Sequence, residues 1–235
     1  MKTELPEIIV VAYHMGRIGS SSIMGLLKLA NINVGRDAKL ARPGPMNPKG
    51  FFELKSHQKF LKKVYNGYYP NITDPPDIVD IDNIGKNYFS DYEQLIKDEF
   101  REDFPIAIKS QRFLTLPFLN YLKNKYKIYV IIISRNLQDQ INSTLRVWNK
   151  YGNSFQKAAN QKFIAEYITK WKNFSVIVEK YYDFPYYHMN FEELINNPLN
   201  ISEKVFSFIQ VESPGDDNVL NWIDKSLVNR PQLVG

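Results

Sequence analysis

Short apolar runs and longer helical repeats alternate along the chain. Segments rich in β-branched and aromatic residues predict strands at Ile8–Tyr13, Ile106–Ser110, Ile128–Ile133 and Phe184–Met189. Apolar residues at helical spacing predict helices over residues 20–30, 53–65, 91–100, 116–125, 137–149, 155–181, 199–209 and 217–227. Strands that alternate with helices indicate an α/β fold with a parallel central sheet flanked by helices on both faces, a three-layer sandwich of the nucleotide-kinase type. The length of 235 residues suits one domain, which we expect to span residues 1–235.

Two proline-rich segments interrupt this alternation. Residues 36–51 contain three prolines and two glycines, and residues 68–82 contain three more prolines. Both are expected to be loops, because proline and glycine disrupt regular elements. Long surface loops often carry recognition residues, so we expect substrate recognition within residues 36–50 and 66–88.

Composition narrows the possible classes of protein. Apolar residues make up 44% of the chain and charged residues 23%, which is typical of a globular protein. No window approaches 18 apolar residues, and Glu4, Pro6 and Glu7 stand where a signal peptide needs an unbroken apolar segment, so we expect a cytoplasmic protein without a membrane span. The absence of cysteine excludes disulfides, thiolate metal sites and a cysteine nucleophile. The net charge of +5 fits a small anionic ligand and gives no argument for nucleic acid.

The stretch VVAYHMGRIGSSSIMGLL, residues 10–27, joins the first strand to the first helix. A helix N-terminus binds anions through unpaired backbone N–H groups and a partial positive charge. Gly16 and Gly19 permit a tight turn, residues 20–22 are three serines that can donate hydroxyl hydrogens, and Arg17 adds a permanent charge. These residues predict an anion site. The alternative is that Ser20 only caps the helix and Arg17 is solvated.

This stretch lacks the lysine of the nucleotide-binding loop G-x-x-x-x-G-K-[ST], because Ser20 follows Gly19. A phosphotransferase of that class also needs a carboxylate near a strand end to hold Mg²⁺. The strand over residues 128–133 is followed by Ser134 and Arg135 instead. The predicted site therefore has cations and hydroxyls without a metal ligand, which suits an anionic donor that reacts without magnesium.

A second group of polar residues follows that strand. Seven residues at about 100° each return a helix close to its starting direction, so Asn136, Asp139, Gln140 and Ser143 share one stripe with Arg135 at its head. An arginine and a serine that converge suit a dianion. Alternatively, Ser143 is a small residue at a packing contact, and Asp139 pairs with Arg135.

Both groups resemble motifs of the sulfotransferases that depend on PAPS, 3′-phosphoadenosine 5′-phosphosulfate. Residues 10–27 are similar to the family's 5′-phosphosulfate loop, which is a strand, then [KR]-x-G-[ST]-[ST], then a helix. Arg135 and Ser143 match an arginine after a buried strand and a serine eight residues later, which clamp the 3′-phosphate. YYHMNFEELINNP resembles a third, weaker motif, a strand followed by YEDL…P. The resemblance covers residues 8–25, 128–149 and 184–198.

This resemblance implies in-line, metal-independent transfer of a sulfuryl group from PAPS to a hydroxyl or amine of a small-molecule, carbohydrate or lipid acceptor, with 3′,5′-ADP as the product. By position in the motifs, the donor would be bound by Arg17, Ile18, Gly19, Ser20, Ser21, Ser22, Arg135, Ser143, Phe191 (at the adenine) and Arg230 (at the 3′-phosphate). Phe191 can equally belong to the core. The fixed charge of Arg17 would stabilise the leaving phosphate.

The general base is where the chain departs from its best-known relatives, because Gln111 stands where the cytosolic branch has the histidine of K-T-H. Other branches use a glutamate after the first helix, and this segment offers Glu53 and His57. Four residues apart, the two would lie on one helical face. Glu53 follows two aromatic residues that can raise the pKa of its carboxyl. Alternatively, Glu53 is an exposed first-turn residue and His57 a surface histidine.

Several positions leave other interpretations open. Lys109 and Arg112 flank the presumed active-site strand, and they either meet an anionic acceptor or stay solvated. His14 and His188 lie at strand ends and are interpreted as structural. A non-catalytic module that binds a nucleotide or phosphorylated ligand is the main rival function, favoured by Gln111. A small-molecule kinase is a second rival, weakened by the missing lysine and aspartate.

Overall fold

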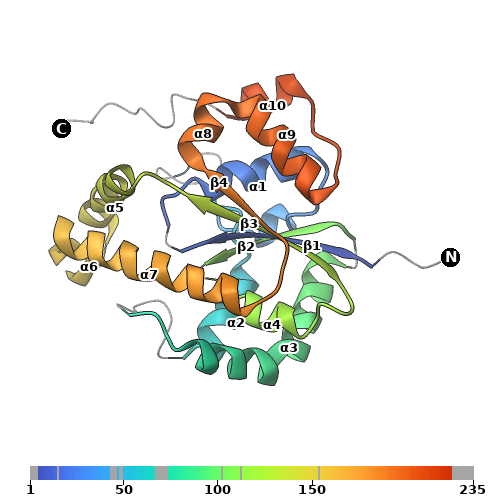
Figure 1. The fold of residues 1–235 in the computed structure, drawn as a ribbon, viewed down its shortest axis with the longest axis horizontal. Helices are drawn as coiled ribbons and strands as arrows, with labels where there is room; N and C mark the ends of the chain where they lie inside the picture. Colours follow the sequence, from blue (N-terminus) through green and yellow to red (C-terminus); the bar gives the residue numbers. More distant parts are fainter. Residues whose placement is uncertain are drawn as a thin grey trace.

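A four-stranded sheet in the order β2-β1-β3-β4 forms the centre of the molecule (Figure 1). The computed structural model describes residues 5–14, 16–42, 47, 50–66, 74–101, 103–111, 113–152 and 154–223. The strands are β1 (Glu7–Tyr13), β2 (Ile106–Gln111), β3 (Lys127–Ser134) and β4 (Tyr186–Asn190). Every neighbouring pair is parallel, as the alternation of strands and helices predicted.

Helices cover both faces of this sheet. Figure 1 shows α1, α8, α9 and α10 above the sheet and α2, α3, α4 and α7 below it, which confirms the α/β sandwich. The helices are α1 (Ser20–Leu29), α2 (Lys55–Val64), α3 (Ile78–Phe100), α4 (Leu116–Asn120), α5 (Leu137–Tyr151), α6 (Ser154–Ala158), α7 (Gln161–Tyr181), α8 (Phe191–Asn196), α9 (Pro198–Ile209) and α10 (Asp216–Trp222), with a 3₁₀ turn η1 (Asp37–Lys39). In the part of the chain that the structure describes, no helix combines the length and apolar character that a membrane span needs.

The two central strands, β1 and β3, are buried on both faces. All residues of β1 after Glu7 are buried, and β3 is buried except at its two ends. Tyr13 at the end of β1 lies opposite Gln111, and Ser134 at the end of β3 lies opposite Asn190. All four strands therefore end at one edge of the sheet, which is where open parallel sheets bind ligands.

Several predicted boundaries differ from those in the structure. The long helix α3 begins at Ile78, within the segment predicted to be a loop, because the Asp77 side chain accepts a hydrogen bond from the Val79 N–H and caps it. The helix predicted over residues 155–181 is two helices, since the Asn160 side chain caps α7 and starts it anew. Helix α8, after β4, was not predicted. These ends depend on single capping side chains, which apolar periodicity does not detect.

Candidate active site

The turn between β1 and α1 leaves the N-terminus of α1 without a capping side chain. Arg17 and Gly19 have left-handed backbone conformations, with φ of 71° and 87°. Gly19 is the N-cap of α1, and no side chain makes a capping hydrogen bond there. Ser20 is the first helical residue and is buried, so its interpretation as the N-cap is wrong. The first-turn N–H groups are therefore not used by a capping side chain, which leaves the helix end suited to an anion.

Gly19 also allows a close contact across the molecule. A Cβ at this position would lie 2.0 Å from Cδ2 of Phe191, the first residue of α8. Phe191 is buried, and the Arg135 guanidinium lies 5.1 Å from its ring centroid. The ring thus fills the space between the turn after β1 and the arginine after β3. This packing bears out the core interpretation of Phe191, and whether the ring also meets a ligand stays a prediction.

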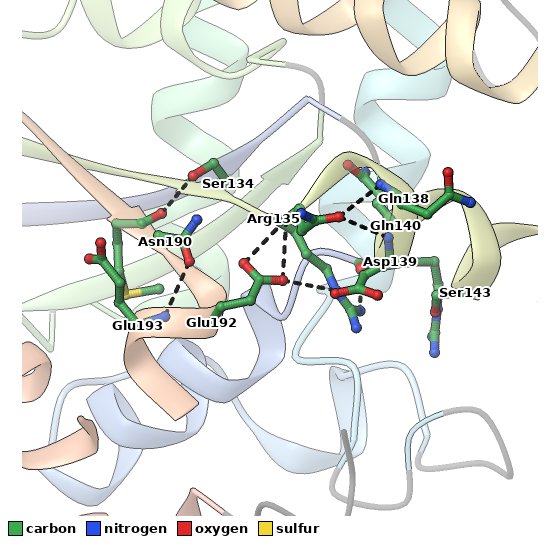
Figure 2. Close-up of polar contacts among 12 residues, drawn as sticks. Ser134, Arg135, Gln138, Asp139, Gln140, Ser143, Asn190, Glu192 and Glu193 are labelled. Atoms are coloured by element: carbon green, nitrogen blue, oxygen red, sulfur yellow. Dashed lines mark hydrogen bonds and ion pairs between the residues drawn. The ribbon is translucent and has the colours of Figure 1, made fainter. Parts of the chain in front are cut away.

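The structure brings the two arginine motifs together. Arg17 Nε donates a hydrogen bond to Ser143 Oγ at 3.2 Å, and Arg135 Nη1 donates to the Arg17 carbonyl oxygen at 2.9 Å. Figure 2 shows Ser143 on the helix that follows Arg135, and Glu192 beside the Arg135 side chain. Residues more than a hundred positions apart thus meet at the carboxyl edge of the sheet. Two of the predicted donor-binding elements form one cluster.

Positive charge dominates this cluster. Burial lowers the pKa of Arg17, and the charges of Arg135 and Arg146 lower it further. Burial also lowers the pKa of Arg135, whose charge is opposed by Glu192 and Asp139. Among the described residues, Arg17 has no carboxylate within ion-pair distance, and Arg135 has Glu192 at 3.6 Å from Nε. An anion placed here would relieve the mutual repulsion of the guanidiniums.

The other residues predicted to bind the donor differ in how exposed their side chains are. The Ile18 side chain lies in the core, so only its backbone can reach a ligand, whereas Ser21 and Ser22 are partly exposed. Arg230 and Arg112 lie outside the described residues. Gln111 is the last residue of β2.

Glu53 lies beside the turn, not on a helix. Helix α2 begins two residues later, so the expected shared helical face with His57 is wrong, and so is the exposed first-turn alternative. The Glu53 carboxylate accepts hydrogen bonds from the Tyr13 hydroxyl at 3.1 Å and Gln58 Nε2 at 2.6 Å. Its Oε1 also lies 3.2 Å from Lys109 Nζ. Glu53 is thus fixed at the same edge of the sheet as the arginines.

Lys109 is the ion-pair partner of Glu53, and the sequence had left open whether its side chain meets an acceptor or is solvated. It lies on β2 and is buried, so the solvated interpretation is wrong. Burial is the main cause that lowers the pKa of Lys109, while Glu53 raises it and Arg17 lowers it. Lys109 and Glu53 form a sequestered ion pair between the arginines and α2.

The structure also shows polar contacts that sequence reasoning missed. Gln140 Oε1 on α5 lies 3.3 Å from His14 Nε2 and accepts from that ring nitrogen, and Gln140 Nε2 donates to the Gly16 carbonyl at 3.2 Å, which supports the turn after β1. Glu192 accepts from the Asn136 backbone N–H at 3.2 Å. A carboxylate just after β4, at the edge where Arg135 lies, was the available signal for Glu192. Gln140 lies on the polar stripe that helical spacing predicted, but the spacing gave no indication of its contacts with His14 and Gly16.

His57 is buried in the core, so the alternative interpretation of His57 as a surface histidine is wrong. Its Nε2 lies 3.1 Å from Thr115 Oγ1 and 3.3 Å from the Tyr92 hydroxyl. Burial lowers the pKa of His57 to about 4, so the ring is neutral at pH 7. His14 is also buried, and its pKa is likewise lowered to about 4 by burial. His188 is exposed and pairs with Glu179.

The two buried histidines predict acid sensitivity. Between about pH 6.5 and about pH 4 the unfolded chain binds protons at His14 and His57 that the folded chain does not. The free energy of unfolding should therefore be highest above pH 6.5 and decrease through this window. We expect urea unfolding across this range to show a shallower decrease for His57→Gln. Identical slopes for wild type and His57→Gln would contradict the prediction.

The fold matches solved sulfotransferases. The sulfotransferase domain from the curacin biosynthetic pathway aligns with a TM-score of 0.51 over 96% of this chain and 80% of that domain, at 15% identity. Sulfotransferase STF1 from Mycobacterium tuberculosis H37Rv aligns with a TM-score of 0.50 over 94% of this chain and 71% of that protein, at 11% identity. No protein-family model and no curated protein matches the chain. The chain thus has the sulfotransferase fold, which confirms the fold implied by residues 10–27 and 128–149.

Proposed function

We propose that the protein transfers a sulfuryl group from PAPS to a hydroxyl or amine acceptor. The observation that carries this proposal is the Arg17 guanidinium, which is mostly buried beside Arg135 and has no carboxylate partner among the described residues. A buried charge without a counterion is unfavourable, so this place is suited to an anionic ligand. Its position at the carboxyl edge of a sulfotransferase fold favours a donor with two separate anionic groups.

The residues present fit such a donor. The uncapped first turn of α1 and Arg17 would hold the 5′-phosphosulfate, and Arg135 with Ser143 would hold the 3′-phosphate. Arg135 Nε is buried and donates no hydrogen bond within the described residues; the Glu192 carboxylate oxygen with which it pairs lies 3.6 Å away, beyond hydrogen-bond distance, so this N–H can still bind an anion. The groups offered are cations, hydroxyls and backbone N–H groups, which bind oxyanions directly.

In the proposed reaction the acceptor oxygen attacks the sulfur in line. The new bond joins acceptor oxygen to sulfur, and the bond between sulfur and the bridging phosphate oxygen breaks to release 3′,5′-ADP. The acceptor proton passes to Glu53. Arg17, which cannot readily donate a proton, would stabilise the negative charge that grows on the leaving phosphate.

Titration with nucleotides tests the donor site. We expect 3′,5′-ADP to bind at least tenfold more tightly than 5′-AMP, because a clamp on the 3′-phosphate adds about 1.4 kcal/mol or more. Calorimetry with and without Mg²⁺ should give the same affinity for 3′,5′-ADP, and ATP should bind no better with Mg²⁺. Equal affinities for 3′,5′-ADP and 5′-AMP would remove the 3′-phosphate site, and Mg²⁺-dependent ATP binding would favour a kinase.

A binding module without turnover is the second candidate, and two observations favour it. Gln111 replaces a histidine of the best-known relatives, and the Glu53 carboxylate is already engaged by Lys109, Tyr13 and Gln58. Incubation with ³⁵S-labelled PAPS and host extract separates the two functions. Transfer of label to an extract component requires the enzyme, whereas tight 3′,5′-ADP binding without any transfer favours the module.

A further inference from the structure

The segment that carries Glu53 is attached to the first turn of α1. Ser21 Oγ donates to the Phe51 carbonyl oxygen at 3.4 Å. Lys109 Nζ donates to that same carbonyl at 2.9 Å and to Ser21 Oγ at 3.2 Å, and it pairs with Glu53. One buried ammonium therefore joins the proposed donor-binding turn to the residues that lead into the proposed base.

A second side chain makes the same connection from the C-terminal helix. Trp222, at the end of α10, donates its indole N–H to the Ser22 carbonyl oxygen at 2.8 Å. Its ring lies so close to α1 that a Cβ at Gly25 would be 1.8 Å from Trp222 Cζ2. The ring also meets Phe52 edge to face, with centroids 6.1 Å apart. Trp222 therefore contacts α1 and the residue that precedes Glu53.

Phe52 adopts an unfavourable backbone conformation at this junction. Its φ is 54°, in the left-handed region that residues other than glycine rarely occupy. Such a conformation is strained and persists only where the surroundings hold it. Here the Phe51 carbonyl is held by Lys109, and the Phe52 ring is buried against Trp222. The chain direction at Glu53 thus depends on both contacts.

We propose that Trp222 is a positioning residue, which together with Lys109 fixes residues 51–53 against the first turn of α1 so that an anion bound at that turn is coupled to the position of Glu53. The coupling rests on the proposed function for what the turn binds and for what Glu53 does. The physical attachment of Trp222 and Lys109 to residues 51–53 does not rest on the proposed function. The two can therefore fail separately.

Fluorine NMR on the full chain tests the coupling, because the sequence contains three tryptophans and 5-fluorotryptophan labelling gives one resonance for each. Trp222→Phe assigns the resonance of interest. We expect saturating 3′,5′-ADP to shift the Trp222 resonance while that of Trp171, which is fully buried, stays in place. Lys109→Met should also shift or broaden the Trp222 resonance without ligand. Lys125→Met, which breaks a more exposed Lys–Glu pair with Glu93, should leave it unchanged.

Each result decides one part of the proposal. A Trp222 resonance that does not respond to Lys109→Met overturns the attachment, and an unchanged Trp171 resonance confirms that the variant is folded. Should Lys109→Met not fold, Ser21→Ala replaces it in the test, because it removes the contacts of Ser21 Oγ with the Phe51 carbonyl and with Lys109. If 3′,5′-ADP binds by calorimetry and the Trp222 resonance does not move, the coupling is overturned. If 3′,5′-ADP does not bind, the proposed function fails, and the response to Lys109→Met still decides the attachment.

Turnover gives a second readout once an acceptor is known. Trp222→Leu keeps an apolar side chain but loses the indole donor and the ring contact with Phe52. We expect it to lower kcat roughly tenfold while the affinity for 3′,5′-ADP changes less than about threefold, because misplacing a catalytic group costs rate more than binding. Trp148→Leu, on α5, is the matched control. Parallel losses of kcat and donor affinity in Trp222→Leu would mark a merely structural residue.

Discussion

Replacing Glu53 by glutamine is expected to lower turnover by roughly 10²–10⁴-fold while 3′,5′-ADP binds as it does to the wild type. Glutamine keeps the shape of the side chain and one acceptor oxygen for Tyr13, but at neutral pH it cannot take the acceptor proton. Glu53 is the carboxylate that the structure places beside Lys109, two residues after the Phe51 carbonyl that contacts Ser21 in the first turn of α1. Steady-state turnover with radiolabelled donor and calorimetry with 3′,5′-ADP measure the two quantities.

The control must account for the ion pair that this substitution breaks. Lys109 is buried, and removing its counterion leaves an uncompensated charge that costs stability. Glu93→Gln makes the same chemical change in another Glu–Lys pair, with Lys125, and should leave turnover near the wild-type value. His57→Gln should also cost little, since that ring is buried in the core. Near-normal turnover in Glu53→Gln, with a collapse in His57→Gln, would assign the base to the histidine.

Removing Arg17 should lower kcat/KM by roughly 10²–10³-fold, with losses in both kcat and donor affinity. In the proposed reaction its guanidinium is the charge that faces the leaving phosphate. Arg17→Lys keeps the charge but loses the planar donor that meets Ser143, so it should recover only part of the rate. The matched variant Arg135→Ala should mainly weaken donor binding and leave kcat closer to the wild type.

Comparison of the two arginines separates binding from chemistry. Arg146→Ala removes an exposed charge that adds to the same field and should have a much smaller effect on both constants. If Arg135→Ala leaves donor affinity unchanged, the contact between Arg135 and the turn is only structural. If Arg17→Ala changes donor affinity without changing kcat, the charge does not act on the leaving group.

The parts of the site that lie on regular elements were predictable from the sequence. Strand β3 is recognisable as a continuous apolar run, and helical spacing places Ser143 seven residues after Asn136 on one stripe. Because parallel strands end at one edge, the turn after β1 and Arg135 after β3 could be expected to meet. The hydrogen bonds between Arg17, Arg135 and Ser143 agree with that expectation.

The parts that depend on burial of polar groups were not predictable. The interpretation of His57 as a surface residue was wrong because Tyr92, on α3, covers it, and α3 itself is twice as long as the apolar pattern indicated. Lys109 was undecided because its counterion, Glu53, comes from an irregular segment. The left-handed backbone of Phe52 has no local sequence signal at all. Such features arise from tertiary packing that overrides local preference.

The contact between Gly19 and Phe191 has a consequence for finding relatives of this chain. A side chain at position 19 would have to occupy the space of the Phe191 ring, so a bulkier residue at 19 requires a smaller one at 191. A glycine ahead of the serine run and a large ring after the fourth strand therefore form one compensating pair, although 171 residues separate them. Where overall identity to known structures is as low as 11%, such a pair gives a physical criterion by which aligned chains can be compared, position 19 against position 191.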